Sequence, residues 1–104
     1  MEANLNTLPE AQAEVEILND KYPGKSLFKF EERLRKEILR LRNNDISMDA
    51  HEIQDLMEAL AQTCNFRTHR IHYQSVTPAP DGHTMLQYEA TLDKFHCFIY
   101  VRDL

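Results

Sequence analysis

The stretch "HTMLQYEATLDKFHCFIYV", residues 83–101, decides the fold of this chain. Apolar and polar residues alternate on both sides of "DK" at 93–94, which is the pattern of two half-buried strands joined by a two-residue hairpin turn. Upstream, "FRTHRIHYQSV" is also rich in β-branched and aromatic residues, and the loop "TPAPDG" separates it from the hairpin. The sequence therefore predicts three antiparallel strands, at about 66–76, 83–92 and 95–102.

Two amphipathic helices are predicted before these strands. Apolar residues recur every three or four positions over 27–43, and the same spacing recurs over 48–63. Asp49 and Glu52 have the spacing of a capping box at the start of the second helix. The break "NND" at 43–45 makes the two helices an antiparallel pair.

The segment 8–21 fits two interpretations. The run "AQAEVEI" alternates apolar and polar residues, as a half-buried strand does. Its apolar residues also fall at helical spacing, and "TLPE" at 7–10 has the form of a capping box with Pro in the first turn. Because Ala, Gln and Glu favour helices, we predict a helix over about 8–21.

The predicted fold class is therefore a two-layer α+β domain. Three N-terminal helices pack on one face of a three-stranded antiparallel meander, in the order ααα-βββ. The chain of 104 residues is short enough that we expect residues 1–104 to form a single domain.

The composition is that of a globular chain, with 42% hydrophobic and 28% charged residues. No apolar run approaches the roughly 18 residues of a membrane-spanning helix. The N-terminus also lacks the basic start and apolar centre of a secretion signal. We therefore expect a cytoplasmic protein without a membrane partner, in which Cys64 and Cys97 are small buried apolar groups and form no disulfide framework.

The net charge of −5 is unevenly distributed along the chain. Residues 25–42 carry seven bases and three acids, whereas residues 43–64 carry five acids and no base. The bases of 25–42 lie on both margins of the apolar stripe, which favours a solvated helix margin over a phosphate grip. Arg35 and Arg42, on one of these margins, are predicted to contact a protein partner.

No residue pattern in the sequence predicts catalysis, a cofactor or a metal. His69 and His72 lie three apart in a predicted strand and therefore point to opposite faces. No paired spacing of His or Cys supplies the four ligands of a structural zinc site. Gly24 and Gly82 stand alone, so there is no glycine-rich phosphate loop. We therefore predict no catalytic, cofactor-binding or metal-binding residues, and no enzymatic activity.

The predicted function is surface contact with another protein. If Cys97 and its neighbours at alternate positions face the core, the intervening side chains share the other face of the sheet. Exposed aromatic and cationic side chains are enriched in protein interfaces. A helix crossing that face, or ordinary cross-strand pairing, is the competing interpretation. The predicted partner-binding residues are His96, Phe98, Tyr100, Arg102, Arg35 and Arg42.

We therefore expect a small protein-binding module of adaptor, inhibitor or immunity type. The stretch "FHCFIYV" contains no charged residue and no Pro, so an unpaired edge there predicts a homodimer through strand 95–102, or a partner strand. The alternative function is a nucleic-acid-associated regulator that uses the basic helix 27–43 with Arg67 and Arg70. The acidity of the chain disfavours that alternative. The third predicted function is a small enzyme whose reaction the sequence does not identify.

Overall fold

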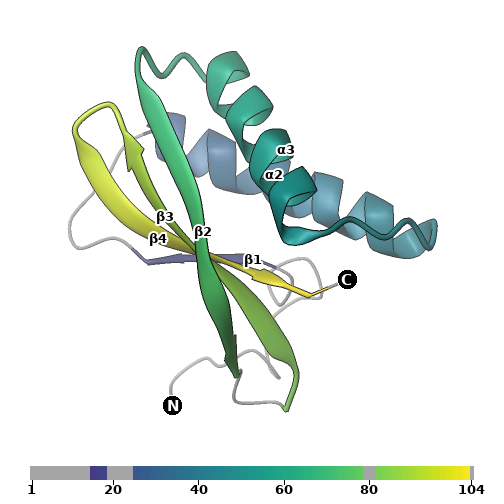
Figure 1. The fold of residues 1–104 in the computed structure, drawn as a ribbon. Coiled ribbons are helices and arrows are strands. Elements are labelled where there is room, and N and C mark those ends of the chain that lie inside the picture. The colour runs from purple at the N-terminus through teal and green to yellow at the C-terminus, as the bar shows by residue number, and fades with distance from the viewer. Residues whose placement is uncertain (1–14, 19–24, 79–81, 104) are drawn as a thin grey trace, which may run out of the picture.

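The computed structural model describes residues 15–18, 25–78 and 82–103. In these residues the chain forms an α+β fold with two helices and one four-stranded antiparallel sheet (Figure 1). The elements are β1 (Val15–Leu18), α2 (Lys25–Asn43), α3 (Ala50–Thr63), β2 (His69–Pro78), β3 (Thr84–Leu92) and β4 (Phe95–Arg102). The strand order is β1-β4-β3-β2, so the predicted meander of β2, β3 and β4 is extended by β1 on the far side of β4.

The predicted arrangement of three helices on three strands is wrong. Val15–Leu18, inside the predicted helix 8–21, form a strand that pairs with β4, from Val15 opposite Val101 to Leu18 opposite Phe98. The rest of 8–21 lies outside the described residues. The reason is tertiary: the pairing satisfies backbone groups of both strands and buries Val15 completely. These gains outweigh the weak helix preference of the Ala- and Glu-rich segment.

The other elements lie close to their predicted positions. Helix α2 begins two residues before its predicted start, α3 begins two residues after it, and both end where predicted. The capping box of α3 is confirmed, because the Asp49 carboxylate accepts from the Glu52 N–H and the Glu52 carboxylate accepts from the Asp49 N–H, each at 2.9 Å. Strand β2 begins later than predicted because Phe66 instead packs edge-to-face on Phe30, with ring centroids 6.2 Å apart.

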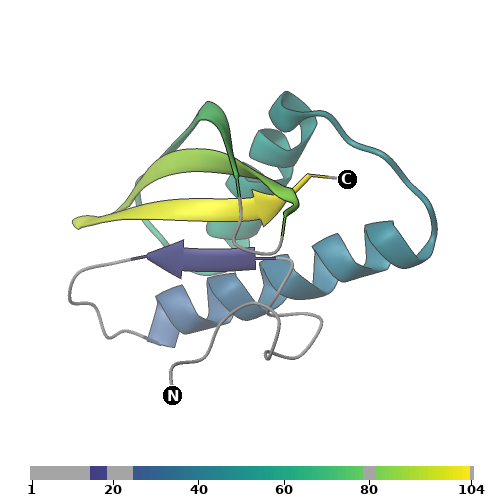
Figure 2. The same ribbon diagram turned by 90° about the horizontal axis from the view of Figure 1, so that it is seen from below.

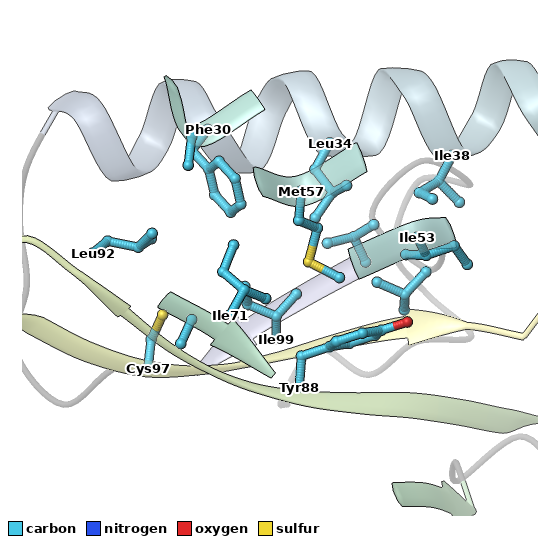
Figure 3. Packing of buried hydrophobic residues seen from close by; sticks show 14 of the residues in the cluster. Phe30, Leu34, Ile38, Ile53, Met57, Ile71, Tyr88, Leu92, Cys97 and Ile99 are labelled. Carbon is cyan, nitrogen blue, oxygen red and sulfur yellow. The ribbon is translucent and has the colours of Figure 1, made fainter. Parts of the chain in front are cut away.

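Both helices cover the same face of the sheet. Helix α2 runs along β1, which lies beside β4, and α3 packs on β2 and β3 (Figures 1 and 2). The core fills the space between these layers: side chains from α2 and α3 point towards Tyr88 and Ile99 of the sheet (Figure 3). Both cysteines are buried, as predicted. The buried Tyr88 hydroxyl donates to the Ala50 carbonyl oxygen at 2.7 Å, tying β3 to the first turn of α3.

Candidate binding face

The candidate site is the face of the sheet that points away from the helices, which we call the outer face. Cys97 lies opposite Ala90, and Ala90 opposite Ile71, and all three are buried on the helix side. The residues between them in sequence therefore belong to the outer face. One row across all four strands contains Leu18, Phe98, Glu89 and His72.

Phe98 of β4 occupies the middle of this row. Leu18 lies directly opposite Phe98 on β1, and 48% of its surface is exposed. On the same strand, the His96 ring meets the Phe98 ring edge-to-face, with centroids 5.1 Å apart and planes at 82°. Phe98 itself is partly exposed. An aliphatic and an aromatic side chain thus form an apolar centre on the outer face.

A polar network borders the apolar centre on its β3 side. His96 Nε2 lies 2.5 Å from Glu89 Oε2, and Gln74 Nε2 donates to Glu89 Oε1 at 2.9 Å. Gln74 Oε1 in turn accepts from Gln87 Nε2 at 2.9 Å. Both oxygens of the Glu89 carboxylate therefore have a partner, and His96 is held against Phe98. The network fixes the rings of the outer face relative to one another.

Gln74 reaches this network because of a β-bulge. The register between β2 and β3 shifts between Tyr73 and Ser75, so Gln74 is an extra residue in β2. A bulge re-aims a side chain relative to strict alternation. The outward position of Gln74 was not predicted from the sequence, because a bulge in "HYQSV" has no Gly or Pro signal.

The predicted partner-binding residues fall into two groups. His96, Phe98, Tyr100 and Arg102 all lie on the outer face, where no described helix covers them. Arg102 is placed opposite Met85, which is buried, so that end of the outer face is less accessible. Tyr100 lies opposite Glu16 of β1 and Gln87 of β3.

Arg35 and Arg42 are separated from this group, because both lie on α2 in the helix layer. Arg35 pairs with Glu31 at 2.6 Å, and its Nε donates to the Val15 carbonyl oxygen of β1 at 3.4 Å. Arg42 donates to the Asp103 carbonyl oxygen at 3.4 Å. Both guanidinium groups therefore connect α2 to the ends of strands, and the structure does not bring them together with the aromatic residues of β4.

The four arginines of α2 make intramolecular contacts. Arg33 donates to the Thr63 hydroxyl of α3 at 2.9 Å, and Arg40 pairs with Glu37 at 3.0 Å. Arg67 precedes β2 and Arg70 is its second residue. The start of β2 lies at the other end of the molecule from the last turn of α2 (Figure 1). Among the described residues, these two arginines thus lie apart from the basic last turn of α2, and the nucleic-acid alternative stays a prediction.

The strand 95–102 does not offer the edge on which the homodimer prediction was based. Strand β4 lies between β1 and β3, so both of its edges are paired. The sheet edges are β1 and β2, and a helix side chain bonds to each of them. Arg35 contacts the Val15 carbonyl of β1, and the Gln54 side chain accepts from the Tyr73 N–H of β2 at 2.7 Å. The premise of an unpaired edge in β4 is wrong.

The buried nucleophiles lie on the core side of the sheet and away from the outer face. Burial, with a smaller effect of the Glu31 charge, raises the pKa of the Cys97 thiol to about 11. A thiol with that pKa is almost entirely protonated near neutral pH and is a weak nucleophile. Among the described residues, no three His, Cys, Asp or Glu side chains are grouped so as to hold a metal ion. No described helix is long and apolar enough to cross a membrane.

No family model, no curated protein and no solved structure gives a match to this chain.

Proposed function

We propose that this protein is a binding module that holds a protein partner on the outer face of its sheet. One observation carries the proposal: exposed Leu18 and partly exposed Phe98 lie opposite each other on β1 and β4, on the face away from both helices. The fold leaves these two apolar side chains partly in contact with water, and a partner that covers them removes them from water.

The surroundings of this pair resemble a protein interface in composition. Interfaces have an apolar core, rich in aromatic residues, within a polar rim. Here Phe98 and Leu18 are the centre, and His96, Glu89 and Gln74 form a rim with satisfied hydrogen bonds. A rim that is already ordered loses little side-chain entropy on binding.

The size of the sheet indicates a small, reversible interface. Strand β1 has four residues and the other three have eight to ten. At about 3.3 Å per residue and about 4.8 Å between strands, the face measures roughly 20 by 30 Å. That planar area is smaller than the roughly 800 Å² that each partner buries in a standard interface. We therefore expect a partner with a protruding apolar side chain that contacts Phe98, and dissociation on a short timescale.

Site-specific photo-crosslinking tests this proposal. A benzophenone amino acid replaces Leu18 in one variant and Ile46 in the control. Both are exposed aliphatic residues, but Ile46 lies in the connection between α2 and α3. In cells of the source organism, we expect a discrete protein adduct from position 18 and none of the same mass from position 46.

The substitution Phe98→Thr, which retains a strand-forming residue, should reduce the adduct from position 18 at least tenfold. Thermal unfolding of each variant verifies that the fold is retained. Equal adducts from positions 18 and 46, or an adduct indifferent to Phe98→Thr, would show that the outer face is not the binding surface. Adducts that disappear on nuclease treatment would favour the nucleic-acid alternative.

A further inference from the structure

Charge is distributed unevenly over the outer face. Arg70 and His72 of β2 lie opposite Thr91 and Glu89 of β3, so both side chains belong to the outer face. Both are exposed, and neither side chain forms an ion pair with another described residue. Glu16 lies on β1, at the opposite edge of the sheet. Arg70 therefore places an unpaired positive charge on the β2 side of the outer face.

A hollow of about 250 Å³ lies beside Arg70. It is lined by Thr68, His69, Arg70 and Thr91, so among the described residues its lining contains no carboxylate. The nearby Glu58 carboxylate is already engaged, because its Oε1 lies 2.6 Å from His69 Nδ1. A guanidinium group only donates hydrogen bonds, and the threonine hydroxyls can donate as well. The hollow therefore suits a group that only accepts hydrogen bonds, such as a carboxylate.

The end of the sheet around this hollow also has a positive balance. Residues 66–70 precede and begin β2, residues 93–94 form the turn between β3 and β4, and the two segments lie at the same end of the sheet (Figure 1). Together they carry three bases, Arg67, Arg70 and Lys94, and one carboxylate, Asp93. Asp93 Oδ1 accepts from the backbone N–H of Arg67 at 2.7 Å. A positive surface of this kind speeds encounter with an acidic partner and disfavours a basic one.

The hollow lies within reach of the apolar pair of the outer face. Arg70, Thr91 and His96 form one row across β2, β3 and β4, and Phe98 lies in the next row. Two strand spacings of about 4.8 Å and two residues of about 3.3 Å place the Cα atoms of Arg70 and Phe98 about 12 Å apart. An extended chain covers that distance in about four residues. One short segment of a partner can therefore contact both places.

We propose that the partner binds through a segment in which an acidic side chain lies about four residues from an apolar one. The apolar side chain covers Leu18 and Phe98, and the carboxylate enters the hollow beside Arg70. This inference rests on the proposed function, because it assigns a chemistry to the partner of the outer face. Leu18 favours a protein over a nucleic acid, since bases stack on aromatic or guanidinium planes and phosphates require a track of several bases.

Selection from a random peptide library tests the inference. Short peptides displayed on phage are selected on the immobilised full chain, once with the wild type and once with Arg70→Glu. On the wild type, we expect enriched peptides to have Asp or Glu about four positions from an aliphatic or aromatic residue. On Arg70→Glu, we expect Lys or Arg in place of that acid, because the charge that it contacts is reversed.

Matched variants locate the binding of the most enriched peptide, whose affinity is measured by fluorescence anisotropy. Arg70→Gln and Phe98→Thr should each weaken binding at least tenfold. Lys36→Gln removes the same charge from an exposed position of α2 in the helix layer, and should change the affinity less than twofold. A single-stranded DNA oligonucleotide of equal net charge should not displace the peptide. Circular dichroism of each variant verifies that the fold is retained.

The outcomes separate this inference from the proposed function. Peptides that require Phe98 but contain no acid and bind Arg70→Gln as well as the wild type would leave the outer face as a protein-binding surface and refute the acidic partner. A selection in which no peptide depends on Phe98 would overturn both proposals. Equal weakening by Lys36→Gln and Arg70→Gln would indicate non-specific attraction, and displacement by the oligonucleotide would indicate a nucleic-acid site. Either result would overturn the inference.

Discussion

The side-chain carbonyl of Gln54 accepts a hydrogen bond from the backbone N–H of Tyr73 at 2.7 Å. Tyr73 lies in β2, an edge strand of the sheet, and Gln54 lies on α3, which packs on β2. An unpaired N–H on an edge strand is a template for pairing with another chain. Gln54 satisfies that donor within the molecule and so protects the edge.

Replacing Gln54 by Met tests this protection. Met is similar to Gln in length and helix propensity but cannot accept a strong hydrogen bond. The part-buried Tyr73 N–H then loses its partner, so we expect the free energy of unfolding to fall by about 1–2 kcal/mol. Sedimentation velocity at two protein concentrations should also show more self-association for the variant than for the wild type.

Gln62→Met is the matched control, because Gln62 is an exposed residue of the same helix. It should change neither the stability nor the sedimentation coefficient. If Gln54→Met unfolds at the same urea concentration as the wild type and sediments identically, Gln54 does not protect the edge.

The parts of the fold that sequence analysis predicted correctly depend on local periodicity. The alternation of 83–101 has period two, and the turn at "DK" has Asp93 at a φ of +57°, in the left-handed region that hairpin turns require. The stripe of α2 has period 3.6, and Phe30, Leu34 and Ile38 are completely buried. Patterns of this kind do not need a partner segment to be recognised.

Strand β1 could not be predicted in this way. It has only four residues, and its partner β4 begins almost at the other end of the chain. Val15 fits an alternating and a helical pattern equally well, so only pairing with β4 decides between them. The predicted unpaired edge at strand 95–102 failed for a similar reason. A strand without charged residues or Pro fits the centre of a sheet as well as its edge, and only the pairing with β1 decides between them.

The candidate site was predictable in part. Strict alternation placed His96, Phe98, Tyr100 and Arg102 on one face, and the register confirms that placement. The bond from Gln74 to Glu89 depends on a bulge, and the bond from Arg35 to the Val15 carbonyl depends on β1. Each of these contacts joins residues that no local pattern relates.

The second prediction concerns Asp93 in the turn between β3 and β4. Asp93→Ala removes the acceptor of two backbone N–H groups and places Ala at a positive φ. Asn retains a side-chain oxygen and tolerates the left-handed region. We expect Asp93→Ala to lower the free energy of unfolding by about 2 kcal/mol and Asp93→Asn by less than about 1 kcal/mol.

Urea unfolding followed by circular dichroism measures both Asp93 variants. The comparison separates the hydrogen bonds and backbone strain from the loss of one negative charge, because both variants lose the charge. If Asp93→Ala and Asp93→Asn lower the free energy of unfolding equally, the charge of Asp93 stabilises the fold and its two hydrogen bonds to backbone N–H groups do not.

The third prediction concerns the ion pair of Glu31 and Arg35, which are each about four-fifths buried. Burial raises the pKa of Glu31, and Arg35 partly opposes this effect. Glu31 therefore binds its proton more tightly in the folded state, and its contribution to stability falls as the pH rises above its ordinary value of 4.5. Removing Arg35 raises the pKa of Glu31 further and steepens that fall.

Arg35→Met should therefore destabilise the protein by about 2–3 kcal/mol at pH 7.5, with a smaller effect near pH 4.5, where Glu31 can take up a proton. The double variant Glu31→Gln, Arg35→Met should recover most of the loss at pH 7.5, because no buried charge is left unpaired. Urea unfolding at the two pH values gives the comparison. A loss for Arg35→Met that is independent of pH would exclude the unpaired carboxylate as its cause.

The last prediction concerns Cys97 at alkaline pH. Its thiol has a pKa of about 11 in the folded protein against an ordinary value of 9.0, chiefly because burial disfavours the thiolate. Between pH 9 and 11 the unfolded chain therefore loses this proton before the folded protein does, and the stability must fall as the pH rises. One pKa unit corresponds to about 1.4 kcal/mol, so the contribution is on the order of 2 kcal/mol over that range.

Cys97→Ala removes this titration and also leaves a small cavity. The cavity lowers stability equally at every pH, so the informative quantity is the change in unfolding free energy between pH 7.5 and 10.5. We expect that change to be smaller in the variant than in the wild type. It should not vanish, because burial also raises the pKa of the Tyr88 hydroxyl. An identical alkaline loss in both proteins would mean that the Cys97 thiol ionises as readily in the core as in water.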